Sequence, residues 1–261
     1  MALRRSTGPY LRGSNSSHDT DDMTPHVLPL LVSVHLPKTA GTSFRAALQA
    51  YYGDGLLEDY AMLPMQVPRG RREILALRDA FNARRQITAS TLAIHGHFLP
   101  VKYRVALRHR ATRYITWLRE PVDRLVSHYQ YWQRDYAGDD PKQPLRNRML
   151  RERWSLERFC LGAELRNLYQ QYLWSFPPAR FAFIGITEHY VQDLDWLARN
   201  LLEAPPAEVM HALGNPNHPA GLYEIDATLR LRIEAHHAAD HELYRQALGQ
   251  RQVRLATTAP E

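Results

Sequence analysis

The sequence has almost no cysteine. Its 261 residues include one, Cys160, so no disulfide can form within the chain and the fold does not depend on an oxidising compartment. No set of cysteine and histidine residues has the spacing typical of a zinc site. Cys160 lies in an expected helix over residues 155–161, where a cysteine is more often part of the core than a nucleophile. We therefore interpret Cys160 as a core residue.

The chain also lacks long apolar runs. The run Val27–Val34 is much shorter than the roughly 20 residues that a membrane-spanning helix needs. The pair Arg4-Arg5 is not followed by an apolar core, which argues against a secretory or twin-arginine signal. The expected organisation is a disordered polar segment over 1–26, one domain over 27–250 and a C-terminal tail over 251–261. We expect a soluble, cytoplasmic protein with no transmembrane segment.

The chain carries more positive than negative charge. The formal net charge is +6, from 33 basic and 27 acidic residues, and the hydrophobic share of 44% is ordinary for a globular protein. A positive net charge favours anionic partners, which include nucleotides, acidic sugars, nucleic acid and membrane surfaces. Charge alone does not separate these partners, and it also fits an ordinary soluble basic protein.

Strands and helices are expected to alternate along the chain. Short apolar or β-branched runs predict strands over 27–34, 92–95, 114–118 and 181–186. Helical periodicity predicts helices over 42–52, 69–86, 121–134, 155–161, 164–174, 187–202 and 223–249. In the helix over 69–86, Ile74, Leu77 and Phe81 fall on one face. We expect Thr187 to cap the helix that follows it. The alternation predicts an α/β fold with a parallel sheet between helices.

The segment 32–45 predicts a phosphate-binding loop. An apolar run ends in a turn that contains Pro37 and Gly41, a helix is expected from Thr42, and Lys38 lies within the turn. Loop amides and a helix N-terminus can bind an anion, and a lysine adds a full positive charge. The loop lacks the Gly-x-x-x-x-Gly-Lys-Ser/Thr spacing, which disfavours a standard ATPase or GTPase. An ordinary strand–helix turn with a solvated lysine would have the same sequence pattern.

A second motif follows the expected strand over 114–118. Arg119 comes directly after the strand, where α/β sheets bind ligands, and Ser127 comes eight residues later in the expected helix. A guanidinium and a hydroxyl from adjoining elements can bind one phosphate group. Alternatively, Glu120 lies near the cap of the helix and Arg119 pairs with it.

The third motif is Ile94-His95-Gly96-His97-Phe98. A neutral imidazole can remove a proton from a hydroxyl during nucleophilic attack. Histidine is also common at strand ends for structural reasons, and most of the 13 histidines must be inert, including His236, His237 and His241.

Together the motifs resemble those of sulfotransferases that use 3′-phosphoadenosine 5′-phosphosulfate (PAPS). The Pro-Lys-Thr-Ala-Gly-Thr-Ser form is similar to the carbohydrate branch, namely heparan sulfate and uronyl 2-O-sulfotransferases and their bacterial relatives. The resemblance implies that the 5′-phosphosulfate is bound by Lys38, Thr39, Ala40, Gly41, Thr42 and Ser43, and that the 3′-phosphate is bound by Arg119 and Ser127. It further implies that His97 is the general base, with His95 as a neighbour of undecided role, and that Lys38 takes part in catalysis.

The resemblance implies a P-loop-like three-layer fold and in-line transfer of a sulfuryl group to an acceptor hydroxyl, with adenosine 3′,5′-bisphosphate (PAP) as product. We expect no metal, no nucleic-acid partner, and an acceptor that is a glycan or another hydroxyl compound, acidic ones included, in a bacterial cytoplasm. The alternatives are a nucleotide-dependent kinase of the phosphate-loop class and a non-catalytic module that binds polyanions.

Residues that bind the acceptor are not fixed by these motifs. Candidates are the arginines of the helix over 69–86, namely Arg69, Arg71, Arg72, Arg78, Arg84 and Arg85, although such a run is usually a solvated face. From its position in the chain, the segment Asn215–Pro219 is a candidate for folding over the cofactor.

Overall fold

A parallel five-stranded sheet forms the centre of the molecule. The computed structural model describes residues 29–134, 139–202 and 223–257. The strands are β1 (Leu30–Val34), β2 (Leu56–Asp59), β3 (Ala93–Gly96), β4 (Thr112–Leu118) and β5 (Phe181–Ile186). Their order across the sheet is β2-β3-β1-β4-β5, and every pairing is parallel. The predicted α/β class is confirmed.

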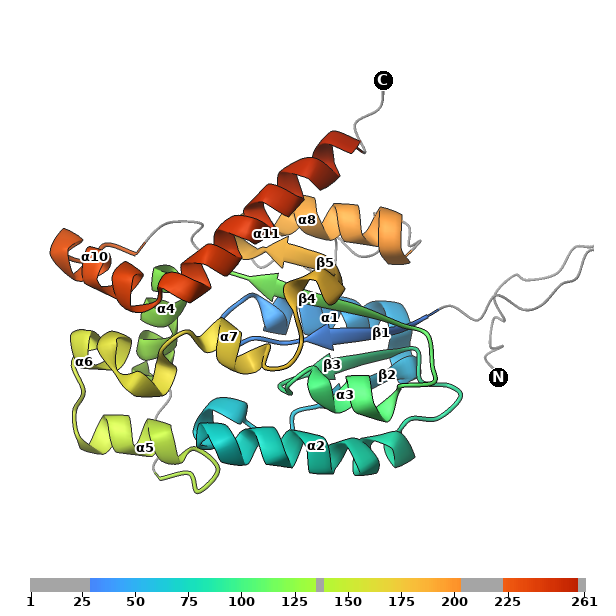
Figure 1. Cartoon of the computed structure of the whole chain (residues 1–261), viewed down its shortest axis with the longest axis horizontal. Coiled ribbons are helices and arrows are strands. Elements are labelled where there is room, and N and C mark those ends of the chain that lie inside the picture. The colour runs from blue at the N-terminus through green and yellow to red at the C-terminus, as the bar shows by residue number, and fades with distance from the viewer. Residues whose placement is uncertain (1–28, 135–138, 203–222, 258–261) are drawn as a thin grey trace, which may run out of the picture.

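Helices surround the sheet. The longer ones are α1 (Gly41–Tyr52), α2 (Arg69–Gln86), α3 (Val101–Ala106), α4 (Pro121–Arg134), α5 (Pro144–Arg151), α6 (Leu156–Leu161), α7 (Leu168–Tyr172), α8 (Tyr190–Leu197), α10 (Ala227–His236) and α11 (Ala238–Thr257). Short 3-10 turns are η1 (Gly53–Gly55), η2 (Pro64–Gln66), η3 (Ala163–Leu165), η4 (Pro178–Arg180) and η5 (Thr187–His189), and η6 (Ala198–Leu202) is a π-helical turn. All the strand arrows point to the side where α4 and α7 lie (Figure 1).

Both faces of the sheet are covered, which is why its strands are almost continuously apolar. Successive residues of a strand point to opposite faces. Leu31 and Ile115 pack with α1 and α8 on one face. Val32 and Tyr114 pack with α2 and α3 on the other, and Ile184 of β5 packs there with α7 and α11. The molecule therefore has three layers, helix–sheet–helix, as predicted.

The register places three strand ends next to one another. Val34, the last residue of β1, pairs with Gly96 at the end of β3 on one side and with Thr116 near the end of β4 on the other. The chain leaves β1 toward the β2 edge and leaves β4 toward the β5 edge, so the connections diverge between β1 and β4. In open α/β sheets, ligands bind outside the carboxyl ends of the strands at such a point.

Most predicted elements are found with small shifts at their ends. The helices over 69–86 and 121–134 and the strand over 181–186 have the predicted bounds. The helix after β1 begins at Gly41, one residue earlier than predicted. Strand β2 and helices α3 and α5 were not predicted, because each is short or strongly charged.

Three predictions about the second half of the chain are wrong. The expected helix over 164–174 is η3 followed by α7, with Asn167 at φ 50° between them. The expected helix over 223–249 is two helices that meet at His237, and the second runs on to Thr257. The break is explained by His237, whose Nδ1 accepts the Asn167 N–H (3.1 Å) while its Nε2 donates to the Cys160 carbonyl (2.7 Å). Thr187 caps no helix, because its hydroxyl donates to the Leu118 carbonyl (2.9 Å).

The face of α2 that carries its large apolar side chains is not the face that packs inward. Ile74, Leu77 and Phe81 are 68%, 40% and 75% exposed. The face that packs inward carries Arg72, Ala76, Ala80 and Ala83 instead. Small alanine side chains let the helix lie close to α3 and the sheet. The fit of these small side chains, and not the burial of the largest apolar ones, therefore decides which face of α2 packs inward.

Two predictions lie outside the described residues, namely the disordered segment over 1–26 and the role of Asn215–Pro219. Within the described ranges, no helix combines the length and the apolar character required to traverse a bilayer.

Candidate functional site at the carboxyl ends of β3, β1 and β4

The loop between β1 and α1 is held in an unusual backbone conformation. Lys38 and Ala40 have φ angles of 68° and 61°, a region that costs free energy for residues other than glycine and that recurs at functional sites. The Thr39 hydroxyl stabilises the turn by donating to the Leu36 carbonyl at 2.9 Å. The loop thus keeps one geometry despite its strain.

The N-terminus of α1 is open to an anion. No side chain of the described residues caps it, and its first turn contains no acidic residue. The first N–H groups of a helix have no partner within the helix and carry the positive end of its dipole. Lys38 lies just before this terminus, so a lysine and a helix N-terminus adjoin one another in this loop.

The contact with His35 leaves no room for a side chain at position 41, the first residue of α1, so this residue must be glycine. An ideal Cβ at this position would lie 1.7 Å from Nε2 of His35, well inside van der Waals contact. The ring of His35 in turn stacks on that of His97, with centroids 4.2 Å apart, and its Nδ1 lies 3.0 Å from the Tyr60 hydroxyl. The absence of a side chain at Gly41 therefore lets the loop close over a stack of imidazoles.

His97 lies at the end of β3 in a defined tautomer. Its Nδ1 is 2.7 Å from the His35 backbone carbonyl, and because a carbonyl can only accept, Nδ1 carries the proton. The lone pair of the neutral ring is then on Nε2. Burial lowers the pKa of His97, although its hydrogen bond to His35 and the charge of Asp59 act in the opposite direction. His97 is neutral at pH 7 and remains partly exposed.

The other candidate, His95, lies deeper. It is 1% exposed, and its Nδ1 is 2.8 Å from the Ser33 hydroxyl within the sheet. Burial lowers its pKa to about 3, with a further lowering from the charge of His97. Its surroundings are typical of a packed structural histidine.

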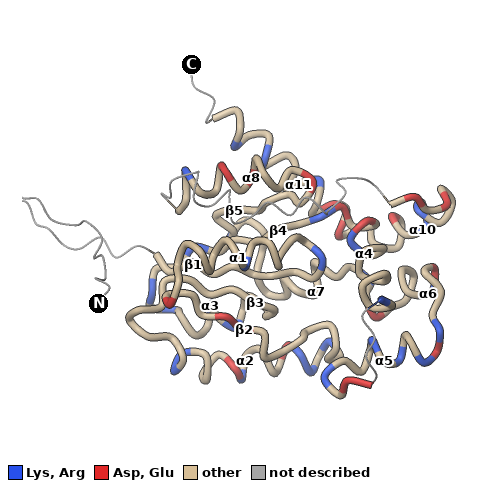
Figure 2. Tube along the Cα trace, turned by 180° about the vertical axis from the view of Figure 1, so that it is seen from behind, with Lys and Arg blue, Asp and Glu red and all other residues tan. Residues whose placement is uncertain are grey.

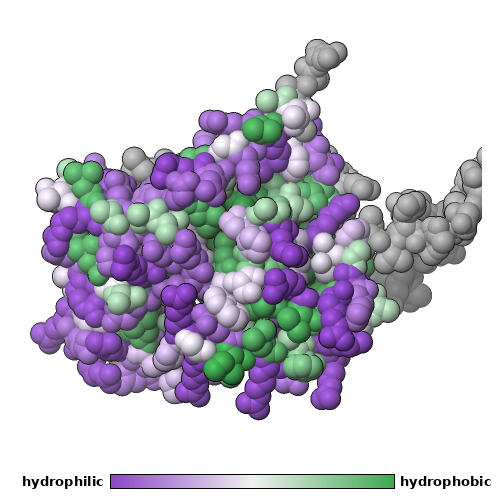
Figure 3. Space-filling model, viewed as in Figure 1, coloured by the Kyte–Doolittle hydropathy of each residue, from purple (hydrophilic) through white to green (hydrophobic). Residues whose placement is uncertain are grey.

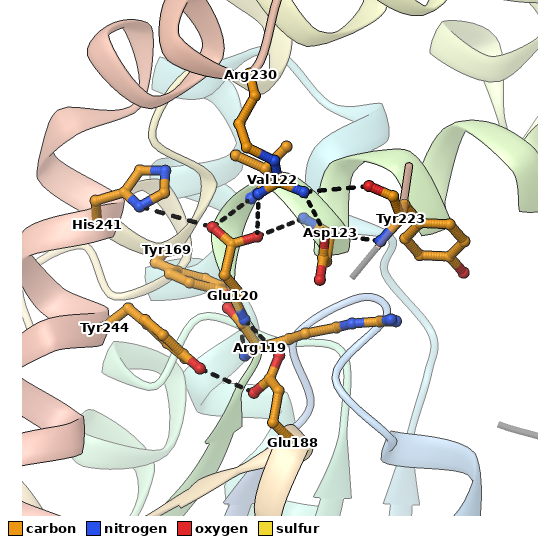
Figure 4. Close-up of polar contacts among 10 residues, drawn as sticks. All are labelled: Arg119, Glu120, Val122, Asp123, Tyr169, Glu188, Tyr223, Arg230, His241 and Tyr244. Atoms are coloured by element: carbon orange, nitrogen blue, oxygen red, sulfur yellow. Dashed lines mark hydrogen bonds and ion pairs between the residues drawn. The ribbon is translucent and has the colours of Figure 1, made fainter. Parts of the chain in front are cut away.

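Arg119 and Glu120 follow β4, and their side chains point in different directions (Figure 4). The Glu120 carboxylate accepts the N–H groups of Val122 (3.1 Å) and Asp123 (2.8 Å), which caps α4. The Arg119 guanidinium faces the ring of Tyr223 at 5.5 Å. Among the residues that the structure describes, it has no ion-pair partner. Thus Glu120 does lie at the cap, but the alternative in which Arg119 pairs with it is wrong.

One stripe of α4 connects the loop of Lys38 with Arg119. Residues 123, 127 and 131 lie one above another on the helix, because they are four residues apart. At one end, the Asp123 carboxylate accepts the Tyr223 N–H at 3.3 Å, and at the other the Lys38 ammonium lies 4.4 Å from the centre of the Tyr131 ring. Ser127, which is almost fully buried, is between them. Lys38 therefore contacts one end of this stripe, and Tyr223, which Arg119 faces, contacts the other end.

Several residues near the site were not predicted. Tyr131 could have been found from its spacing of four residues from Ser127. His128 and Arg124 are buried on another face of α4, and burial together with the charge of Arg124 lowers the pKa of His128 well below its usual value. Within the described ranges, the side-chain nitrogens of Arg124 have no hydrogen-bond partner. Packing alone brings His128 and Arg124 to this place, so no signal in the sequence identifies these two residues.

Other candidate residues have structural surroundings. Arg72 is buried, donates to the Val67 carbonyl (2.9 Å) and to Gln171 (2.8 Å), and is therefore unlike a solvated acceptor-binding arginine. Cys160 is buried in the core, as predicted, and burial raises the pKa of its thiol to about 12. The described ranges contain no group of three or more His, Cys, Asp or Glu side chains that could hold a metal ion.

Comparisons with known proteins give distant matches of fold. No family model matches the chain, and no curated protein is similar to it in sequence. A sulfotransferase from Alicyclobacillus acidocaldarius superposes with a TM-score of 0.41 at 15% identity, over 81% of this chain and 92% of that one. Mouse sulfotransferase SULT7A1 complexed with PAP superposes with a TM-score of 0.39 at 14% identity, over 79% of this chain and 62% of that one. The fold class itself rests on the parallel sheet described above.

Proposed function

We propose that this protein is a sulfotransferase that moves the sulfuryl group of PAPS to a hydroxyl of an acceptor, with a carbohydrate as the acceptor class. One observation carries the proposal. The register of β3, β1 and β4 brings a neutral histidine, a lysine-containing anion loop and an arginine with no ion-pair partner among the described residues to adjacent strand ends. A transferase that handles an anionic nucleotide and a hydroxyl needs these three chemistries together.

The cofactor would be held at two ends. The amides and hydroxyls of residues 39–43, with Lys38, suit the 5′-phosphosulfate, because the first turn of α1 has neither a side-chain cap nor an acidic residue. Arg119 and Ser127 suit the 3′-phosphate, since a guanidinium and a hydroxyl bind phosphate oxygens well. When bound, PAPS supplies an activated sulfuryl group.

His97 is the proposed general base. A sugar hydroxyl is a weak nucleophile, and its proton must leave as the oxygen attacks. The Nδ1–H of His97 is held by the His35 carbonyl, which directs the lone pair on Nε2 away from the backbone. His95, whose Nδ1 bonds to Ser33 inside the sheet, keeps the neighbouring backbone in place in this proposal.

Lys38 and the N-terminus of α1 would stabilise the transition state. Negative charge grows on the leaving phosphate as the sulfuryl group departs, and a fixed ammonium with helix N–H groups stabilises such charge without reorganisation. Tyr131 faces the ammonium of Lys38 and limits the directions that this side chain can take.

A transfer assay tests the proposal. The purified chain is incubated with ³⁵S-labelled PAPS and a panel of acidic and neutral glycans, and in parallel with ³²P-labelled ATP. We expect ³⁵S in at least one glycan, a loss of about 10²-fold or more in rate for His97→Gln, and an unchanged rate for the exposed control His109→Gln.

Other results would contradict this proposal. Label transferred from ATP but not from PAPS would establish a kinase. Salt-dependent binding of polyanions with no transfer from either donor would establish a binding module.

A further inference from the structure

The outward face of α2 carries an apolar stripe that the described part of the chain leaves exposed. Ile74, Leu77 and Phe81 recur at helical spacing, and all three are exposed to solvent. The stripe belongs to a well-anchored helix, because Ala76 and Ala83 on the opposite side pack into the core. Figure 3 shows hydrophobic side chains over α2 and α3 at the lower edge, mixed with hydrophilic ones.

Arginines border this stripe on both sides. By helical periodicity, Arg71, Arg78 and Arg85 lie along one side of Ile74 and Phe81, and Arg84 lies beside Leu77 on the other. These four arginines are exposed, and none forms an ion pair with a described residue. We call the seven residues together the α2 ridge: Arg71, Ile74, Leu77, Arg78, Phe81, Arg84 and Arg85.

No exposed position of α2 carries an acidic side chain. Its two acidic residues, Glu73 and Asp79, are only partly exposed, and Glu73 pairs with Arg69 at 3.3 Å. Figure 2 shows the positive charges distributed along α2, which lies at the outer edge of the molecule. From Arg71 to Arg85 the ridge is therefore about 21 Å long, apolar along its centre and cationic along its sides.

We propose that the α2 ridge docks on an anionic lipid bilayer. Apolar side chains on such a helix enter the boundary between headgroups and acyl chains, while arginines beside them remain at the level of the phosphates. A second copy of this chain would bring the same arginines face to face, which disfavours self-association. A protein partner would need an acidic groove to receive a protruding ridge, whereas a lipid surface adapts to it.

Vesicle sedimentation tests this proposal. The full chain is mixed with vesicles of phosphatidylcholine, with or without about 30% phosphatidylglycerol, at two salt concentrations. We expect binding only to the anionic vesicles. Each of Arg78→Gln and Arg85→Gln should lower the partition coefficient about fivefold, and Ile74→Ser with Phe81→Ser about tenfold or more.

Matched controls come from α11. Val253 is 67% exposed, and the side chain of Arg245 is 70% exposed. Val253→Ser and Arg245→Gln should leave vesicle binding unchanged, and circular dichroism should show that all variants remain folded.

Four results would overturn the proposal: absence of binding to anionic vesicles, equal losses in the α11 controls, losses in the arginine variants without losses in Ile74→Ser with Phe81→Ser, or concentration-dependent self-association that the ridge variants abolish. The third result would indicate a polyanion patch, and the fourth would indicate a second copy as the occupant.

Discussion

Gly41 is the residue at which the loop, the helix and the imidazole stack meet. Its missing side chain makes room for His35, whose carbonyl holds the proton on Nδ1 of His97. The preceding turn, in which Lys38 and Ala40 have strained positive φ angles, directs the start of α1 toward His35. A single small residue thus links the anion loop with the proposed base.

Gly41→Ala should damage both stability and cofactor binding. The new methyl group must displace the His35 ring or the start of α1, and overpacking of this kind costs about 1–3 kcal/mol. Urea denaturation measures the loss, and titration with PAP should show weaker binding. Gly249→Ala is the control: its Cβ meets nothing within 4 Å in the middle of α11, so it should gain about 0.5–1 kcal/mol. Full stability and unaltered PAP binding in Gly41→Ala would contradict this account of the loop.

At the scale of elements, the sequence predicts four of the five strands, and it misses β2. Each of Lys38, His97 and Arg119 follows a short strand whose composition is distinctive, and parallel strands bring their carboxyl ends to one edge. The spacing of Arg119 and Ser127 likewise places the serine on α4. These features depend on local sequence alone.

What could not be predicted depends on contacts between distant segments. The orientation of α2 could not be predicted, because its alanines, rather than Ile74 and Phe81, fit against the core. The break between α10 and α11 follows from the hydrogen bonds of His237 to α6 and to the segment before α7. His35 joins the site through its stacking on His97, which no spacing in the sequence reveals.

At the scale of the whole molecule, the fold buries several histidines in the neutral form. Burial lowers the pKa of His237 to about 4 and of His95 to about 3, and it also lowers the pKa values of His35, His97 and His128. An unfolded histidine has a pKa near 6.5, so below that pH the unfolded chain binds more protons than the folded one. Falling pH therefore favours unfolding.

We predict that the free energy of unfolding decreases by about 3 kcal/mol or more between pH 7.5 and pH 5. Over this range, the stabilisation that His237 and His95 contribute to the folded state falls by about 2 kcal/mol each. Burial raises the pKa of Asp240 to about 6, so its contribution rises by about 1 kcal/mol and offsets part of this loss. Urea denaturation at a series of pH values measures this dependence. His237→Gln should flatten it, and the exposed control His189→Gln should not. A stability that is constant or increases toward pH 5 would contradict the burial of neutral imidazoles.

The central claim is that the loop of Lys38 and the guanidinium of Arg119 bind the two ends of one bisphosphorylated adenosine along the α4 stripe. Isothermal titration of PAP into the unmodified chain, Lys38→Ala, Arg119→Ala and His97→Gln tests it most directly. We expect binding by the unmodified chain, a weakening of about 10- to 100-fold in each of the first two variants, and affinity within about twofold for His97→Gln. An unmodified chain that does not bind PAP, or an equal loss in all three variants, would contradict it.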